Sequence, residues 1–202
     1  MKHDRLNSRL AAGACALLLL LCAGAHAQEQ ARYKELPNFQ QVNAKLYRGG
    51  QPERGGLAIL ARLGVRMIIN LRGADARTRA EEQEAKALGL RYFNVPLPGL
   101  SRPSVASVER VLSLIADTES QPVFVHCQRG SDRTGTIIAC YRIAHDGWTA
   151  QAALAEAKHY GLSRFARGMK HFIEEYGRRH DAASHIARAN MRARQSSHLL
   201  PS

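Results

Sequence analysis

A short segment around one cysteine holds the residues best suited to do chemistry. In residues 122–135, PVFVHCQRGSDRTG, five residues separate Cys127 from Arg133. The apolar run before Cys127 predicts a short buried strand, and the residues from Thr134 onward predict a helix. The segment between them is then a turn at a helix N-terminus, where backbone N–H groups and the helix dipole attract an anion such as phosphate.

The same turn can activate a nucleophile. The positive field at the start of the helix, together with the guanidinium of Arg133, favours the thiolate of Cys127 over the thiol. Five intervening residues allow the loop to close and bring the planar fork of Arg133 to two phosphate oxygens. The pattern therefore predicts a thiolate that attacks a bound phosphate group.

These positions resemble the signature of the cysteine-dependent protein tyrosine and dual-specificity phosphatases. That signature is His-Cys, five residues that include Gly, then Arg and Ser or Thr, and it is present at His126, Cys127, Gly130, Arg133 and Thr134. The resemblance extends from about residue 36 to residue 176. It implies that Cys127 takes the phosphoryl group and that the loop binds it through Gln128, Arg129, Gly130, Ser131 and Arg133.

The neighbouring residues receive supporting roles. We expect the Thr134 hydroxyl to hydrogen-bond the departing thiolate, Gly130 to allow close backbone approach, and His126 to orient the loop from below. Arg72 and Arg102 are candidates for second contacts to an anionic substrate, with ordinary surface roles as the alternative. A buried structural cysteine at a strand end is the alternative for the nucleophile. It does not account for the glycine, arginine and hydroxyl in register.

The general acid is the part of the mechanism that departs from the resemblance. Dual-specificity phosphatases usually carry an Asp on a loop some thirty residues before the cysteine, but residues 95–103, VPLPGLSRP, contain no carboxylate. We favour Asp132, because myotubularin-like lipid phosphatases and bacterial families with a Gly-x-Asp-Arg-Thr loop carry their acid at this point. Its alternative role is to accept N–H groups at the helix start. Asp75 and Asp117 are the other candidate acids.

The N-terminus predicts export. A basic start, an apolar run at residues 10–23 and the small-x-small site Ala25-His26-Ala27 predict a signal peptide over residues 1–27, with Gln28 as the first mature residue. We therefore expect a periplasmic or secreted protein. The run is shorter than the roughly 20 residues that span a bilayer, so no membrane span is expected after cleavage. Retention as an anchor or as a lipoprotein at Cys22 is the alternative.

Composition narrows the partners and cofactors. The formal charge is +12, and +10 without residues 1–27, which favours anionic partners. Cys127 and Cys140 remain in the mature chain, and on one helix they would lie about 20 Å apart, too far for a disulfide. Cys140 is expected in the core. No His, Cys and carboxylate residues cluster at metal-ligand spacing, so no metal or other cofactor is predicted.

Residues 28–177 are expected to form a single α/β domain like that of dual-specificity phosphatases, with a partly parallel sheet flanked by helices. Residues 178–202 form a basic tail, expected to be disordered or a frayed helix, with polyanion binding as the alternative. The predicted strands lie at 39–42, 45–52, 65–70, 90–95 and 123–126, and the predicted helices at 54–63, 78–88, 104–115, 134–146, 149–160 and 163–180.

The expected function is hydrolysis of phosphomonoesters through a phosphorylated Cys127. Phosphotyrosine proteins are the first substrate class, and phosphoserine, phosphothreonine or phosphoinositides are the others; no nucleic-acid partner is expected. The alternative function is a catalytically weak module that binds phosphate or polyanions and lost the usual acid. A sulfurtransferase is a third hypothesis, disfavoured because Arg133 and Thr134 suit a tetrahedral oxyanion.

Overall fold

A five-stranded sheet in the order β1-β2-β5-β3-β4 forms the centre of the computed structural model, which describes residues 33–197. β1 is antiparallel to β2, and all other neighbours are parallel. The α/β class and the partly parallel sheet are confirmed. The predicted signal peptide lies outside the described residues. The strands are β1 (Gln40–Asn43), β2 (Leu46–Gly49), β3 (Met67–Asn70), β4 (Arg91–Asn94) and β5 (Val123–His126).

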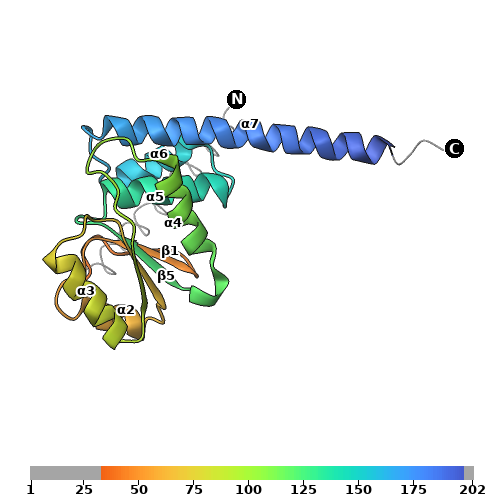
Figure 1. Cartoon of the computed structure of the whole chain (residues 1–202). Coiled ribbons are helices and arrows are strands. Elements are labelled where there is room, and N and C mark those ends of the chain that lie inside the picture. Colours follow the sequence, from red (N-terminus) through yellow and green to blue (C-terminus); the bar gives the residue numbers. More distant parts are fainter. Residues whose placement is uncertain (1–32, 198–202) are drawn as a thin grey trace, which may run out of the picture.

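Helices cover both faces of this sheet. Figure 1 shows α2 and α3 on one face and α4, α5, α6 and α7 on the other. Every residue of β3 and β5 is buried, as expected for parallel strands covered on both faces. The helices are α2 (Gly56–Arg62), α3 (Ala76–Ala87), α4 (Val105–Ala116), α5 (Asp132–Ala144), α6 (Ala150–His159) and α7 (Arg167–Ser197), with a short 3-10 turn at Thr118–Ser120.

Two apolar cores hold the edge of the sheet that carries the candidate site. Successive residues of a strand face opposite sides, so in β5 Val123 and Val125 pack toward α4, α5 and α7, while Phe124 packs toward α2 and α3. The cysteine segment predicted to follow this strand is therefore anchored between two packed layers. No helix between residues 33 and 197 has both the length and the apolar character needed to cross a bilayer.

The ends of two helices differ from the prediction. The predicted α3 begins at Thr78, but in the structure it is capped by Asp75, whose carboxylate accepts the Thr78 N–H at 2.7 Å. The spacing of Phe165, Met169, Phe172, Ile173 and Tyr176 predicts one buried stripe on the helix expected at residues 163–180. The last four are buried, whereas Phe165 is 64% exposed because the chain there is still in the turn before α7.

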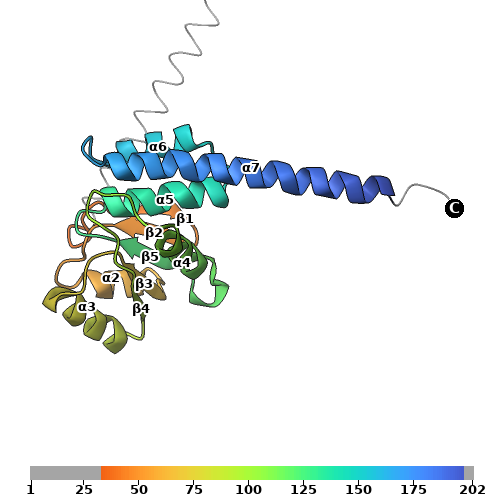
Figure 2. The same ribbon diagram turned by 45° about the horizontal axis from the view of Figure 1, so that its top comes forward.

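The last helix also runs further than expected. α7 continues to Ser197, past the end predicted near His180, and leaves the body of the domain as a single helix (Figures 1 and 2). Much of the basic segment 178–202 is therefore helical. Its flexibility and its role stay predictions.

Candidate active site

The cysteine segment crosses the carboxyl-terminal edge of the parallel strands. We call residues 127–133 the phosphate loop. It begins where β5 ends at His126 and passes into α5, which starts at Asp132, two residues earlier than predicted. Ligands of open α/β sheets bind at this edge, and the positive end of the α5 dipole lies at the loop. The predicted strand-turn-helix is confirmed.

The first two carbonyl groups of the phosphate loop are held by polar neighbours. The Nδ1 atom of His126 lies 3.3 Å from the carbonyl oxygen of Cys127. The backbone N–H of Gln51, just past β2, donates to the carbonyl of Gln128 at 3.2 Å. His126 is fully buried, so its ring lies against the start of the loop, while its role in orienting the loop stays a prediction.

The next two carbonyls are held by side chains from the N-terminal part of the domain. Asn38 donates through Nδ2 to the carbonyl of Arg129 at 3.3 Å. Arg48 of β2 donates through Nη2 to the carbonyl of Gly130 at 2.7 Å. Four consecutive carbonyls are thus held by groups outside the loop or directly before it.

This arrangement orients the backbone for an anion. In a trans peptide the C=O of one residue and the N–H of the next point in opposite directions, so holding the carbonyls of residues 127–130 directs the N–H groups of residues 128–131 the other way. Within residues 33–197, no hydrogen bond uses these four N–H groups. Successive N–H groups of this kind form a concave site for phosphate.

Gly130 is required by the backbone geometry of the loop. Its φ of +73° lies in the left-handed region, and a Cβ at this position would overlap the backbone of Gly49 and lie 2.6 Å from the Gly50 nitrogen. The loop therefore packs directly on the end of β2. Glycine therefore allows the loop backbone to approach β2 closely at this position, and the role of Gly130 toward a bound phosphate stays a prediction.

The two cysteines of the domain have separate environments. Cys127 and Cys140 are both free thiols. Cys140 is fully buried in the apolar core, as expected, and burial raises the pKa of its thiol well above the usual range. Cys127 opens the phosphate loop at the N-terminus of α5 and is therefore the thiol suited to act as a nucleophile.

Arg133 and Thr134 lie on the first turn of α5. Arg133 donates through Nη1 to the carbonyl of Leu71, just after β3, at 3.3 Å, a bond that uses one of the five N–H groups of the guanidinium. The Thr134 hydroxyl is fully buried and lies 3.5 Å from the carbonyl of Gly49. Its predicted bond to the departing thiolate stays a prediction.

A buried carboxylate lies behind the loop at a position that the sequence does not predict. Glu81 of α3 is only 6% exposed. It accepts from Gln51 at 2.7 Å, from Asn70 at 2.6 Å and from Tyr92 at 2.9 Å, and it lies 3.1 Å from Nε2 of His126. No local pattern marks it, because its partners come from four separate segments.

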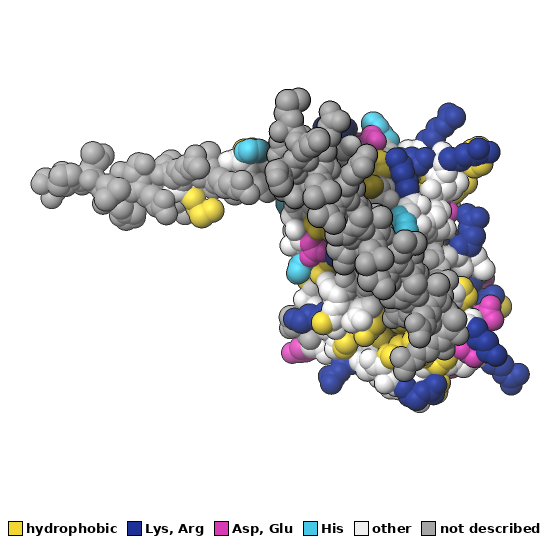
Figure 3. Space-filling model, turned by 180° about the vertical axis from the view of Figure 1, so that it is seen from behind, with side chains coloured by type: hydrophobic (Ala, Val, Ile, Leu, Met, Phe, Trp, Pro, Cys, Tyr) yellow, Lys and Arg dark blue, Asp and Glu magenta, His cyan; other side chains and the backbone are white. Residues whose placement is uncertain are grey.

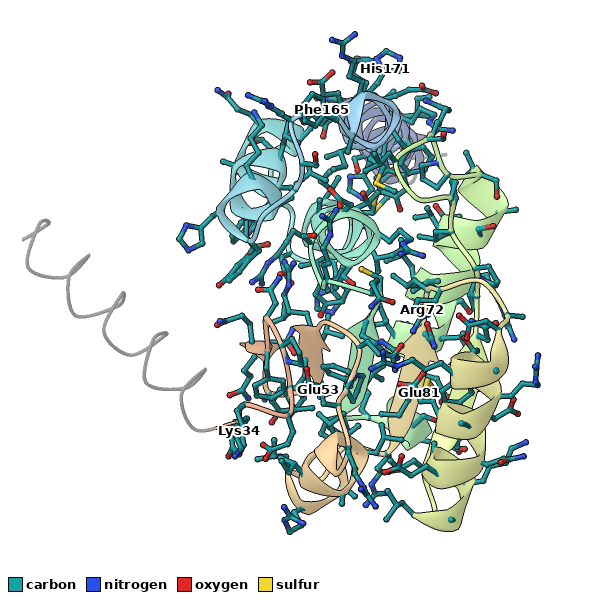
Figure 4. The ribbon with its side chains drawn as sticks, turned by 90° about the vertical axis from the view of Figure 1, so that its left-hand side faces the viewer. Lys34, Glu53, Arg72, Glu81, Phe165 and His171 are labelled. Atoms are coloured by element: carbon teal, nitrogen blue, oxygen red, sulfur yellow. The ribbon has the colours of Figure 1, made fainter. Side chains whose placement is uncertain are left out.

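Glu81 stays ionised behind the loop and connects it to Arg72. Burial alone would raise the pKa of Glu81, but contacts from His126, Tyr92 and Asn70 outweigh burial and hold it below the usual value. Gln51 bridges the two charges, because its Oε1 accepts from Arg72 at 2.6 Å while its Nε2 donates to Glu81. Figure 4 shows Arg72 and Glu81 close together, far from Phe165. The candidate Arg72 thus lies beside the site.

Comparison with known proteins assigns the family. Residues 26–175 match the family model described as "DSP-PTPase phosphatase fused to NAD+ Kinase". The chain belongs to the cysteine-dependent dual-specificity phosphatase family. The predicted resemblance is therefore confirmed over most of the chain.

Named relatives fall into two groups. The dual specificity protein phosphatase TpbA of Pseudomonas aeruginosa is 33% identical over 126 residues, which are 62% of this chain and 55% of TpbA, so the match spans about half of that relative. The inositol diphosphatase DSP5 of Arabidopsis thaliana is 30% identical over 148 residues, 69% of this chain and 70% of DSP5.

Solved structures agree with the fold. The crystal structure of TpbA has a TM-score of 0.60 and 29% identity, and the match covers 69% of this chain and 84% of that one. The catalytic core of the PP-IP phosphatase SIW14 of S. cerevisiae, 24% identical, has a TM-score of 0.64 over 77% of this chain and 94% of that one, which is a likeness of fold.

Asp132 is the one carboxylate inside the family's phosphate loop in this chain. Its side chain is largely buried; Oδ1 accepts the backbone N–H of Ser163 at 2.7 Å, and Oδ2 accepts from Arg129 at 2.8 Å. Asp132 therefore does not cap the first N–H groups of α5, which was its alternative role. Oδ1 joins the loop to the turn between α6 and α7, and Oδ2 pairs with Arg129, whose side chain is 69% exposed.

The other two candidate acids have different environments. The backbone N–H of Thr78 and the charge of Arg72 hold the pKa of Asp75 below its usual range, which makes that carboxyl a poor proton donor at neutral pH. Asp117 forms an ion pair with Arg91 at 2.8 Å. Arg91 begins β4, so this pair lies at the opposite edge of the parallel strands from the phosphate loop.

The remaining predicted contact, Arg102, has structural partners. It pairs with Glu175 of α7 at 2.7 Å and lies over the ring of Phe172 at 5.1 Å.

Basic side chains are more evident than acidic ones on the face in Figure 3, in line with the net charge. Within the described residues, no three His, Cys, Asp or Glu side chains are grouped to hold a metal ion.

Proposed function

We propose that the protein is a phosphatase that hydrolyses phosphomonoesters through a covalent phosphocysteine at Cys127. The observation that carries this proposal is the geometry of the phosphate loop. The carbonyls of residues 127–130 are held by neighbouring groups, so the N–H groups of residues 128–131 point the opposite way, and the loop begins with a free thiol. Family membership supports the same chemistry.

The reaction has two steps. The Cys127 thiolate attacks phosphorus, a P–S bond forms, and the P–O bond to the leaving group breaks while an acid gives that oxygen a proton. Water, which loses a proton to the same residue, then attacks phosphorus, and the P–S bond breaks to give inorganic phosphate and thiolate. The loop N–H groups and Arg133 stabilise the phosphoryl oxygens in both steps.

Asp132 is the acid in this proposal, supported by its place inside the loop and by the exposed guanidinium of Arg129, which can move aside. Changing Asp132 to asparagine should lower the rate of alkyl phosphate hydrolysis by about 10²–10³-fold. The rate for an activated aryl phosphate should fall much less, because an aryl leaving group hardly needs a proton. The amide can still accept the Ser163 N–H. Steady-state kinetics on both substrates measures the difference.

Asp75→Asn is the matched control for Asp132, since it removes a carboxylate that caps α3 and pairs with Arg72. In Asp75→Asn, any loss of activity should be the same for alkyl and aryl phosphates. Equal losses on both substrates in Asp132→Asn would argue that Asp132 only joins the loop to the turn before α7.

Phosphotyrosine is the proposed substrate class, supported by the solved complex of TpbA, a dual specificity protein phosphatase, with pTyr. We expect faster phosphate release from a phosphotyrosine peptide than from a phosphoserine peptide or from an inositol diphosphate, the class in the name of DSP5. A colorimetric phosphate assay compares the three. Fastest release from the inositol compound would reassign the substrate, and binding of phosphate without turnover on all three would favour the alternative binding module.

We also propose that the protein is exported, on the basis of the signal-peptide pattern at residues 1–27. Expression of the full chain in a bacterial host should give a form in the periplasm or medium whose N-terminal sequencing starts at Gln28. A cytoplasmic form that retains Met1 would contradict export.

A further inference from the structure

Arg48 is a buried cation that the proposed mechanism leaves unused. Its side chain is 1% exposed, and its guanidinium lies 4.4 Å over the ring of Tyr160. Nη2 donates to the carbonyl of Gly130, whereas Nε and Nη1 have no acceptor within the described residues. Burial lowers the pKa of Arg48 to about 10, so it is still charged at neutral pH.

Its surroundings provide no carboxylate in contact. No ion pair in the described part of the chain includes Arg48, and the nearby Glu156 is bound to Arg142 at 2.8 Å. A buried charge without a paired ion costs stability, and an apolar side chain of similar volume would fill the space at lower cost. A purely structural role therefore does not explain a guanidinium here.

The register of the sheet places this charge next to the phosphate loop. Arg48 is paired with Val125 of β5, and Gly49 with His126, so the side chain leaves β2 beside the last strand residues before Cys127. The loop is where the proposed reaction forms anions, first the thiolate and then the bound phosphate. At low local dielectric a buried cation acts strongly on such charges.

We propose that Arg48 is a positioning residue for the phosphate loop. Its Nη2 holds the Gly130 carbonyl so that the N–H of Ser131 faces the phosphate, and its charge favours the bound anion. The inference rests on the proposed phosphate loop, but it is tested by phosphate binding, which needs no turnover.

The test compares Arg48→Gln, which removes the charge and keeps an amide donor, with Arg48→Lys, which keeps the charge. Alkylation of Cys127 by iodoacetamide is followed at one fixed pH by mass spectrometry of its peptide, over a range of inorganic phosphate concentrations. We expect Arg48→Gln to need about tenfold more phosphate than the wild type for half-maximal protection. Arg48→Lys should be protected at the wild-type phosphate concentration.

Arg91→Gln is the matched control. Arg91, like Arg48, lies over an aromatic ring, that of Phe93, but it pairs with a carboxylate, Asp117, and lies at the opposite edge of the parallel strands. It should leave protection by phosphate at the wild-type level. Wild-type protection in Arg48→Gln would overturn the proposal. If that variant does not fold, weakened protection in Arg48→Lys overturns it and wild-type protection supports it.

Discussion

Replacing Cys127 with serine is expected to reduce phosphate release from an aryl phosphate by at least about 10⁴-fold. A serine hydroxyl is not ionised at neutral pH, so the nucleophile is lost while the loop that holds the phosphate stays. The measurement is phosphate release by the purified protein under reducing conditions, with a chelator present.

Cys140→Ser is the control for Cys127→Ser, because it makes the same change at a buried thiol outside the phosphate loop. It should lower the free energy of unfolding, since it buries a hydroxyl in an apolar core, while the folded fraction keeps its turnover. Turnover by Cys127→Ser close to that of the wild type would contradict the role of Cys127.

Changing Arg133 to lysine is expected to lower kcat/KM for an aryl phosphate by about 10²–10³-fold. Lysine keeps the positive charge but loses the planar fork that binds two phosphate oxygens, so charge alone should not rescue activity. The loop should stay folded, because its carbonyls are held by Arg48, Asn38 and Gln51 and not by Arg133.

The control for Arg133→Lys is Arg91→Lys, the same substitution at the far edge of the sheet. Its kcat/KM should match the wild type. If Arg133→Lys were as active as Arg91→Lys, bidentate binding of phosphate by Arg133 would be excluded.

The sequence predicted the local parts of the site well, because strand, turn and helix signals are local. The apolar run before Cys127 forms β5, and a helix, α5, follows the turn as expected. Ser104 caps α4 at the start of the helix predicted from residue 104, since an N-cap depends on residues within three positions.

The sequence did not predict what supports the loop. Asn38, Arg48 and Gln51 hold loop carbonyls from about 80 to 90 positions away in the chain. Glu81 accepts hydrogen bonds from three segments and contacts His126 of a fourth. Such contacts depend on the strand order, which places β2 beside β5, and no spacing rule encodes that order.

Misplaced helix ends have a related cause. Phe165 fits the helical spacing of Met169 and Phe172, but α7 starts only at Arg167. The turn before it is instead held by the bond from Ser163 to Asp132. A long-range contact to the phosphate loop therefore overrides local periodicity at this point.

Trapping the phosphoenzyme tests the role of Cys127 most directly. The protein would be mixed with a radiolabelled aryl phosphate, quenched within the first turnover, and digested for mass spectrometry. We expect a phosphoryl group on the peptide that contains Cys127, and no such label in Cys127→Ser. Steady turnover with the label on another residue, or with no covalent label at all, would contradict that role.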